Sequence, residues 1–212
     1  MQTDVSSVSS GPWERPILRV GPVAPTAALL VGIVGFATNQ GGDIRTGLFP
    51  IAMAIAFTLL ALCAQAVLWV HEQPPRMITL GGWGTTLALL GPAGFFASVA
   101  LGAMLGLDED TLGGFAILPV ASMAFGILTL PIASTILALA VRRSGHLPAR
   151  ATTSLLIAGW VPPLQMVFGG LTEGTAERVG SAALAATFIG AWLLTGSAVR
   201  PRKPTPATES RR

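Results

Sequence analysis

Six long runs of apolar residues, separated by short polar segments, dominate the pattern of the chain. A helix that crosses a membrane needs about 20 mostly apolar residues, and each run approaches or exceeds that length. No stretch shows the strict apolar–polar alternation of a half-buried strand. The pattern therefore predicts an all-α, polytopic membrane helix bundle with six transmembrane helices, at residues 22–38, 47–70, 79–105, 115–141, 151–170 and 180–199.

Polar segments flank this six-helix domain, which we place at residues 21–199. Residues 1–20 lack the apolar core of a cleavable signal peptide, so we expect a disordered cytoplasmic tail followed by an uncleaved anchor. Residues 200–212 are basic and rich in proline, which is typical of an extended, solvated tail. No soluble domain fits between the apolar runs.

The positions of Lys and Arg predict the orientation, because basic residues gather on the cytoplasmic side of membrane proteins. With both termini in the cytoplasm, eleven of the 13 basic residues fall inside, and only Arg45 and Arg178 fall outside. Trp69, Trp83 and Trp192 then lie toward the inner ends of their helices, where interfacial anchors occur. Arg greatly outnumbers Lys, and Ala and Gly are abundant, which is typical of a GC-rich bacterial genome. We therefore expect a multi-pass protein of the bacterial plasma membrane.

Composition narrows the function classes. The 212 residues are 51% hydrophobic and 11% charged, whereas a soluble domain carries about 25% charged residues. These values exclude a soluble globular enzyme and a disordered chain, and the single Cys63 excludes an internal disulfide. The basic residues lie in short connecting segments rather than on a soluble face, so we expect the lipid bilayer and no nucleic acid as a partner.

Small residues recur every four positions in the third run, at Gly94, Ser98, Gly102 and Gly106. At 3.6 residues per turn they fall on one narrow face of a helix. Lipid gives helices no hydrophobic drive to associate, and small residues let two backbones approach closely. We expect this face to pack against another helix of the bundle, with a homo-oligomer or a membrane protein partner as the alternative.

No Asp, Glu, Lys, Arg or His lies in the interior of a predicted span. Intramembrane ionisable groups mark proton and ion paths, so the pattern argues against a proton-driven pump or an ion channel. For Gln65 and Gln165, at membrane depth, we expect hydrogen bonds between helices, with a ligand headgroup as the alternative. His71 and His146 fall in inner loops, where we expect solvated side chains. Their spacing matches no metal site, and we expect no metal and no cofactor.

Pro92, Pro131 and the pair Pro162-Pro163 interrupt three of the runs. A proline removes a helical hydrogen bond and bends the helix, and the freed carbonyls need partners inside the bundle. Because kinks widen a bundle locally, these prolines predict a pocket between the helices.

Two acidic residues of the predicted outer loops, Asp43 and Glu173, are candidate catalytic acids. Crowded carboxylates beside an apolar medium have raised pKa values, and a protonated carboxylic acid can serve as a general acid. Aromatic rings that steady a cation would complete a terpene-cyclase-like site. The alternative is that these acids only mark the water boundary. The candidate ligand-binding residues are Phe49, Phe95, Phe96, Phe115, Trp160 and Gln165.

The segment Arg142-Arg-Ser-Gly-His-Leu-Pro-Ala-Arg150, followed by Ala-Thr-Thr-Ser-Leu-Leu-Ile-Ala-Gly-Trp160, resembles small Ala/Gly-rich six-span bacterial membrane proteins, which are mostly uncharacterised. These proteins share a basic loop that ends in Leu-Pro before the fifth helix. The likeness covers about residues 115–200. It implies the fold and the topology, and it transfers no site residue.

The function that these observations favour is a non-catalytic integral membrane protein. Its role would be accessory or binding, toward a membrane partner or a lipophilic ligand. One alternative is a membrane-embedded enzyme that acts on an isoprenoid or lipid substrate. The other is a transporter of a neutral hydrophobic compound, without coupling to ions.

Overall fold

The computed structural model describes residues 14–38, 48–71, 74–107, 109–171 and 174–199, with side chains except at 14–15, 109–116, 169–171 and 174–178. Every regular element in these ranges is an α-helix. The helices are α1 (Glu14–Val20), α2 (Ala24–Thr38), α3 (Phe49–Trp69), α4 (Arg76–Met104), α5 (Glu109–Ser144), α6 (Ala149–Leu171) and α7 (Gly174–Val199).

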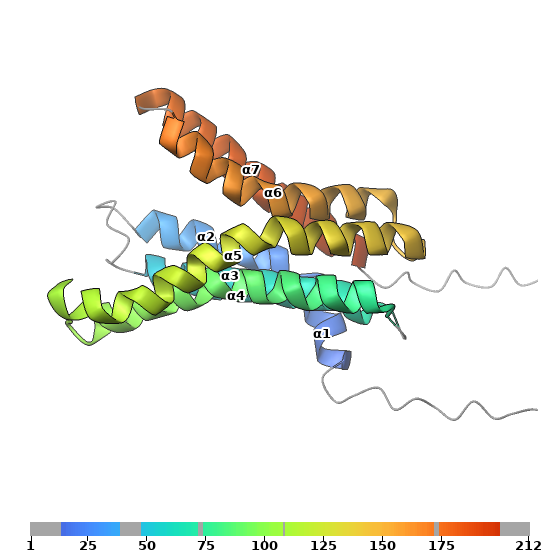
Figure 1. The fold of residues 1–212 in the computed structure, drawn as a ribbon, viewed down its shortest axis with the longest axis horizontal. Coiled ribbons are helices and arrows are strands. Elements are labelled where there is room, and N and C mark those ends of the chain that lie inside the picture. The colour runs from blue at the N-terminus through green and yellow to red at the C-terminus, as the bar shows by residue number, and fades with distance from the viewer. Residues whose placement is uncertain (1–13, 39–47, 72–73, 108, 172–173, 200–212) are drawn as a thin grey trace, which may run out of the picture.

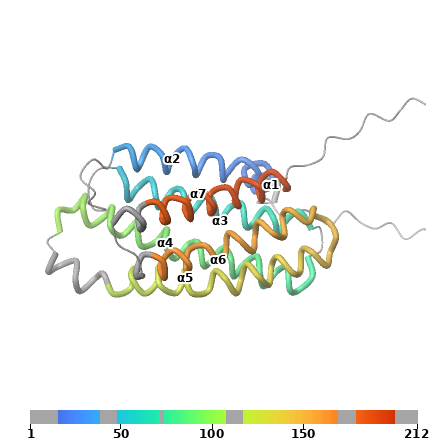
Figure 2. The backbone as a smooth tube through the Cα atoms, turned by 90° about the horizontal axis from the view of Figure 1, so that it is seen from above, coloured from blue at the N-terminus to red at the C-terminus, as the bar shows by residue number. Residues whose placement is uncertain are grey.

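Helices α2 to α7 run back and forth along one axis, and α1 crosses one end of the bundle (Figure 1). From α2 to α7, each helix packs against the next one in the chain. In addition, α7 contacts α2 and α3. The chain enters through α1 and leaves α7 at the same end of the bundle (Figure 2). We call this the basic end, because it carries Arg76, Arg142, Arg143 and Arg150.

Five of the helices are long and apolar enough to cross a membrane, which indicates a multi-pass membrane protein. The prediction of an all-helical membrane bundle is confirmed to this extent. The first predicted span forms α2, which has 15 residues. At 1.5 Å per residue it is about 22 Å long, short of a hydrocarbon core of about 30 Å. Six spans therefore remain a prediction.

Three helices differ from the prediction, and one of them, α7, begins at Gly174 rather than at residue 180. Helix α1 forms at Glu14–Val20, within the segment 1–20 that we expected to be disordered, so that expectation does not hold for these residues. Helix α5 extends over Glu109–Ser144, and it continues through Pro119 and Pro131. Figure 1 shows that α5 bends rather than breaks. Residues 1–13 and 200–212 lie outside the described ranges.

Glycines on α4 and α5 hold these two helices in close contact. A Cβ added to Gly81 would lie 2.6 Å from the backbone nitrogen of Leu137, and one added to Gly126 would collide with the carbonyl oxygen of Ala88. That carbonyl has no helical partner, because Pro92 four residues later lacks an N–H. The backbone of Gly126 thus lies close to an acceptor that a proline has freed.

The predicted small-residue face of α4 does not form this contact. Nothing lies within 4 Å of a Cβ added to Gly94 or Gly106, and Gly106 follows the helix with φ +63°. The Ser98 hydroxyl donates to the carbonyl of Gly94 in its own helix. Gly102 alone among the four is buried. The contact with α5 is made by another face of α4, which carries Gly81, Gly84 and Gly91.

Polar side chains also link helices inside the bundle. Gln65 donates to the Thr86 hydroxyl at 2.7 Å, from α3 to α4. The Ser154 and Thr195 hydroxyls lie 2.9 Å apart, between α6 and α7. Both pairs are buried. The expected use of Gln65, a hydrogen bond between helices, is therefore observed.

Candidate functional site

The α6–α7 hairpin diverges from the other helices toward the end opposite the basic end (Figure 1). A cavity of about 1010 Å³ lies between this hairpin and helices α2 to α5. Small-molecule sites usually occupy about 300–1,000 Å³, so this cavity is at the upper limit of that range. All six long-axis helices contribute to its wall.

Close contacts seal the cavity on the side of the basic end. A Cβ added to Gly196 of α7 would lie 2.9 Å from the carbonyl oxygen of Pro22, in the turn between α1 and α2. One added to Gly159 of α6 would collide with the Ser134 hydroxyl of α5. Between these contacts, the Trp192 ring forms the floor of the cavity and is only 1% exposed. The hairpin is thus in close contact with the rest of the bundle toward the basic end, and it diverges from the bundle toward the opposite end.

The wall of the cavity is almost entirely apolar. Alanine, glycine and proline make it wide, and larger aliphatic and aromatic side chains fill its sides. None of the described lining residues is ionisable. The lining includes Ala28, Gly32, Ile33 and Phe36 of α2, Phe57 and Leu60 of α3, Leu89, Pro92 and Phe96 of α4, Met123 and Ile127 of α5, Pro162, Gln165 and Met166 of α6, and Ser181, Ala185, Phe188 and Trp192 of α7.

Of the aromatic residues predicted to bind a ligand, Phe96 lines the cavity. Its ring stacks on Phe57 at 6.1 Å and meets Phe49 edge-on at 5.9 Å. Phe49 is buried behind Phe96 and does not reach the cavity. Phe95 also packs on Phe96, at 5.3 Å, from outside the lining. Phe96 therefore forms part of the cavity wall as predicted, whereas Phe49 and Phe95 pack against Phe96 and do not line the cavity.

Two other predicted residues have different positions. Trp160 faces away from the cavity with 52% of its surface exposed, and its indole N–H donates to the Thr135 hydroxyl at 3.2 Å. It is therefore no part of this site. The Phe115 side chain lies outside the described residues. Asp43 and Glu173, the candidate acids, also lie outside them.

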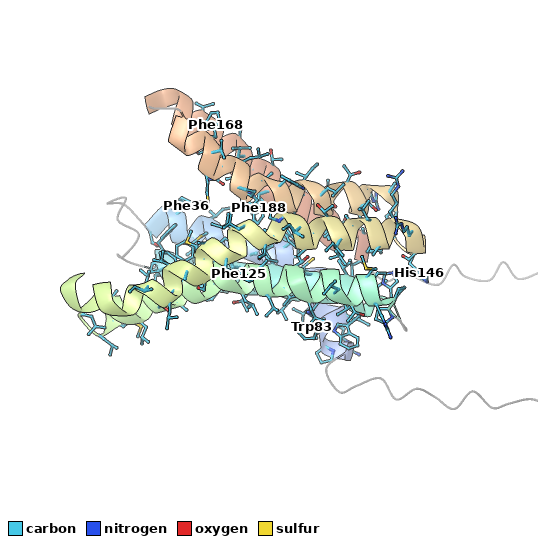
Figure 3. The ribbon with its side chains drawn as sticks, in the orientation of Figure 1. Phe36, Trp83, Phe125, His146, Phe168 and Phe188 are labelled. Carbon is cyan, nitrogen blue, oxygen red and sulfur yellow. The ribbon has the colours of Figure 1, made fainter. Side chains whose placement is uncertain are left out.

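Sequence reasoning missed several residues of the cavity. Phe36 on α2 and Phe188 on α7 lie on the two sides of the region where the helices diverge (Figure 3). Trp192 was predicted to be an interfacial anchor, but it is buried at the cavity floor. The signal in the sequence was weak, since an aromatic residue near the end of an apolar run fits both an interface and a buried wall.

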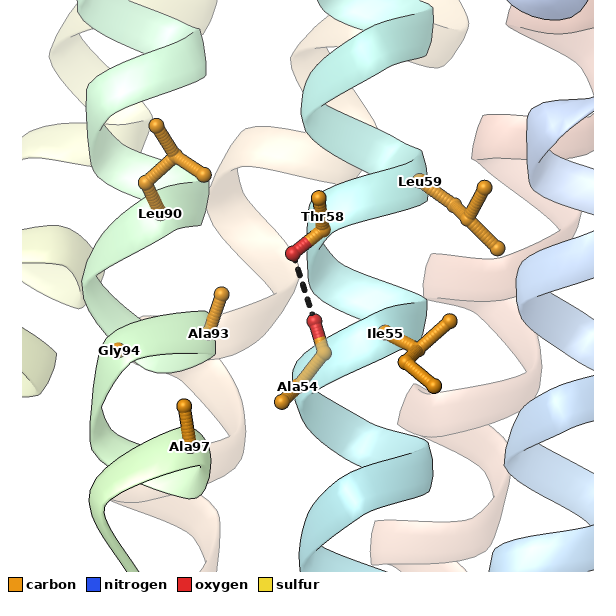
Figure 4. Close-up of a pocket in the computed structure, with 8 residues that line it drawn as sticks. All are labelled: Ala54, Ile55, Thr58, Leu59, Leu90, Ala93, Gly94 and Ala97. Atoms are coloured by element: carbon orange, nitrogen blue, oxygen red, sulfur yellow. Dashed lines mark hydrogen bonds between the residues drawn. The ribbon is translucent and has the colours of Figure 1, made fainter. Parts of the chain in front are cut away.

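A second, shallow groove lies on the outer surface between α3 and α4 (Figure 4). Its volume is about 440 Å³, and Gly94 and Ala97 form part of its wall. The one hydroxyl in the groove, Thr58, donates to the carbonyl of Ala54 at 2.8 Å, in its own helix. The groove thus offers a small-residue surface, but none of its side chains has an uncommitted donor.

A pair of histidines lies at the basic end, where Figure 3 labels His146. His71 is buried, and its Nε2 is 3.0 Å from the Ser144 hydroxyl. The two imidazole rings are 4.8 Å apart. Burial lowers the pKa of His71 below its ordinary value, and His146 lowers it further, while the Val67 carbonyl opposes the shift. The expectation that His71 is solvated is therefore wrong, because the end of α5 covers it.

Fold and cavity together define a helical multi-pass membrane protein with a large apolar cavity between its helices. In comparisons with protein-family models, with curated proteins and with solved structures, none matches this chain. Among the described residues, no group of three or more His, Cys, Asp or Glu side chains is placed to hold a metal ion.

Proposed function

We propose that this protein binds a neutral lipophilic molecule, which enters the cavity from the bilayer where α6 and α7 diverge from α2 and α5. The observation that carries this proposal is a cavity of about 1010 Å³ with an apolar wall and no ionisable group among its described lining residues. A water molecule takes up about 30 Å³ in the liquid, and a methylene group is of similar size. The cavity thus has room for about 30 such groups, which is more than one lipid acyl chain and close to the size of two.

The same proposal includes a topology. Six helices cross the plasma membrane of a bacterium, α2 being the short one, and the basic end faces the cytoplasm. This orientation is supported by the Arg residues at that end and by the rule that positive residues stay inside. The cavity then opens toward the outer half of the bilayer, where the α6–α7 hairpin diverges.

We place binding ahead of catalysis because of the groups that line the cavity. The described lining contains hydrogen-bonding side chains but no general acid, no general base and no nucleophilic thiol. A terpene-cyclase-like reaction would need a carboxylic acid beside the substrate. Transport of a neutral compound would need the same binding site, so it is a variant of this function rather than a separate one.

Filling the cavity tests the proposal. Gly32 on α2 lines the cavity, and nothing lies within 4 Å of a Cβ added there. A Gly32→Trp side chain therefore starts in open space on the cavity wall and takes up part of the cavity. Gly190 on α7 is the matched control, because its Cβ position is equally open but outside the cavity lining. Ala185→Trp, from the opposite wall, is a second variant in case Gly32→Trp disturbs the fold.

The measurement is native mass spectrometry of protein extracted gently from its own membranes. We expect wild type and Gly190→Trp to carry the same lipophilic molecule, and Gly32→Trp and Ala185→Trp to lose most of it. If the two cavity variants carry it at the wild-type stoichiometry, the molecule binds elsewhere and the proposal fails. The proposal also fails if wild type carries none.

A further inference from the structure

Three polar side chains interrupt the apolar wall of the cavity: Gln165 on α6, and Ser181 and Trp192 on α7. Within the described part of the chain, none of the three has a hydrogen-bond partner for its side chain. Gln65 is different, because its amide nitrogen donates to the Thr86 hydroxyl. Polar groups left unpaired in apolar surroundings cost free energy, so a ligand that pairs with them binds more tightly than one that does not.

The packing of α6 on α7 fixes the relative heights of these groups. Ser154 lies opposite Thr195, and Phe168 lies against Gly180. Since both helices advance 1.5 Å per residue, Gln165 is level with the part of α7 only about two residues from Ser181. Trp192 is about 13 Å deeper along the axis. The cavity thus has a polar level near its open end and a long apolar section below it.

Gln165 is also accessible from the cavity. Its side chain is half-buried, as is that of Ser181, whereas the indole nitrogen of Trp192 is fully enclosed. A ligand can therefore reach the amide and the hydroxyl without any movement of the protein. An amide both donates and accepts hydrogen bonds, so it can pair with a hydroxyl or with a carbonyl group.

We propose, resting on the binding function above, that the ligand is a neutral lipid with an oxygen-bearing head. Its hydroxyl or carbonyl group hydrogen-bonds Gln165 and Ser181, and its apolar chain extends down to the Trp192 ring. A charged head is excluded, because the described lining holds no ionisable side chain to compensate it and an uncompensated buried charge is costly. A plain hydrocarbon fills the space but leaves Gln165 unpaired.

Three probes with the same branched carbon skeleton test this proposal: phytol with an allylic hydroxyl, saturated phytane with no polar group, and phytanic acid with a carboxylate at neutral pH. Purified protein in micelles is equilibrated with each probe at equal concentration, and native mass spectra give the fraction bound. One net hydrogen bond predicts that wild type prefers phytol to phytane by about 2- to 10-fold. Phytanic acid should bind no better than phytane.

The variant Gln165→Leu should bring the phytol-to-phytane ratio close to one while phytane still binds. Ser181→Ala should lower the phytol-to-phytane ratio by less than Gln165→Leu does. If Gln165→Leu fails to fold, Ser181→Ala is the variant that tests the proposal. Thr187→Val is the control, because Thr187 is exposed outside the cavity lining and bonds only to the Ala183 carbonyl in its own helix. It should keep the wild-type ratio.

Several results would overturn the proposal. The proposed hydrogen bonds to the head group are refuted if wild type binds phytol and phytane equally, or if both cavity variants keep the wild-type ratio. Either result still leaves a cavity that binds lipophilic molecules. Stronger binding of phytanic acid refutes the neutral head. If wild type retains no probe, the inference fails, and the Gly32→Trp comparison then shows whether the binding function fails with it.

Discussion

Gly81 and Gly94 lie on the same helix, α4, and differ sharply in what surrounds them. A Cβ added to Gly81 would lie 2.6 Å from the backbone nitrogen of Leu137 and 2.7 Å from its Cα, whereas nothing lies within 4 Å of a Cβ added to Gly94. We predict opposite effects for two identical substitutions. Gly81→Ala should destabilise the bundle, and Gly94→Ala should stabilise it.

The magnitudes follow from two terms. Alanine in a helix is favoured over glycine by about 1 kcal/mol. Overpacking costs about 1–3 kcal/mol, and the upper value applies at Gly81 because the neighbouring atoms are backbone and cannot rotate away. The net effect is a loss of about 2 kcal/mol for Gly81→Ala and a gain of up to about 1 kcal/mol for Gly94→Ala. At about 2–4 °C per kcal/mol for a chain of this size, Tm falls by about 4–8 °C in the first variant and rises by about 2–4 °C in the second.

Cys63 provides the assay. It is the single cysteine of the chain and is fully buried, so a maleimide dye that fluoresces on reaction with a thiol reports unfolding during a thermal ramp in micelles. A fall in Tm for Gly94→Ala larger than that for Gly81→Ala would refute the reasoning. It would show that the Gly94 face makes the tight contact, either within the bundle or between copies of the chain.

Two further predictions concern the basic end and the α6–α7 hairpin. Because burial lowers the pKa of His71 below 6.5, the unfolded chain binds more protons than the folded one, so stability should be full above that pH and should fall as the pH drops through the folded-state pKa. The Tm of wild type should decrease from pH 8 to pH 5 more than that of His71→Gln, and parallel curves would exclude His71 as the cause. For the Ser154–Thr195 pair, a double-mutant cycle of Ser154→Ala and Thr195→Val should give a coupling of about 0.6–1.7 kcal/mol. A value near zero would show that the 2.9 Å contact contributes nothing.

Apolar run length predicted the helices well, because a membrane span must satisfy its backbone hydrogen bonds internally and needs a minimum length. The run at 79–105 became α4, Arg76–Met104, within a few residues at each end. Prolines were harder to interpret. Pro92 lies inside a continuous helix, and Gly126 of a neighbouring helix lies close to the carbonyl that it frees, a contact that sequence alone does not reveal.

The candidate site was less predictable, because it depends on how helices are placed relative to one another. Phe96 and Gln165 were identified from their residue types at membrane depth, and both line the cavity. Trp160 satisfied the same criteria, yet it faces outward. Helical periodicity shows which side chains share a face of one helix, but it does not show which face points into the bundle. His71 was misjudged for the same reason, since its burial comes from the end of α5.

The position of the cavity follows from the distribution of small-residue contacts. Gly159 against Ser134 and Gly196 against Pro22 lie at the basic-end side of the hairpin, and beyond them larger side chains meet across a widening gap. In water an apolar gap of this size would close, but lipid gives helices no hydrophobic drive to do so. An empty cavity would forfeit dispersion contacts along its whole wall, so lipid chains fill it when nothing else does. A specific ligand must therefore displace lipid of nearly equal dispersion energy, and only the hydrogen bonds at Gln165 and Ser181 distinguish the two. This is why the ratio of phytol to phytane, rather than the affinity of either probe alone, tests what the cavity recognises.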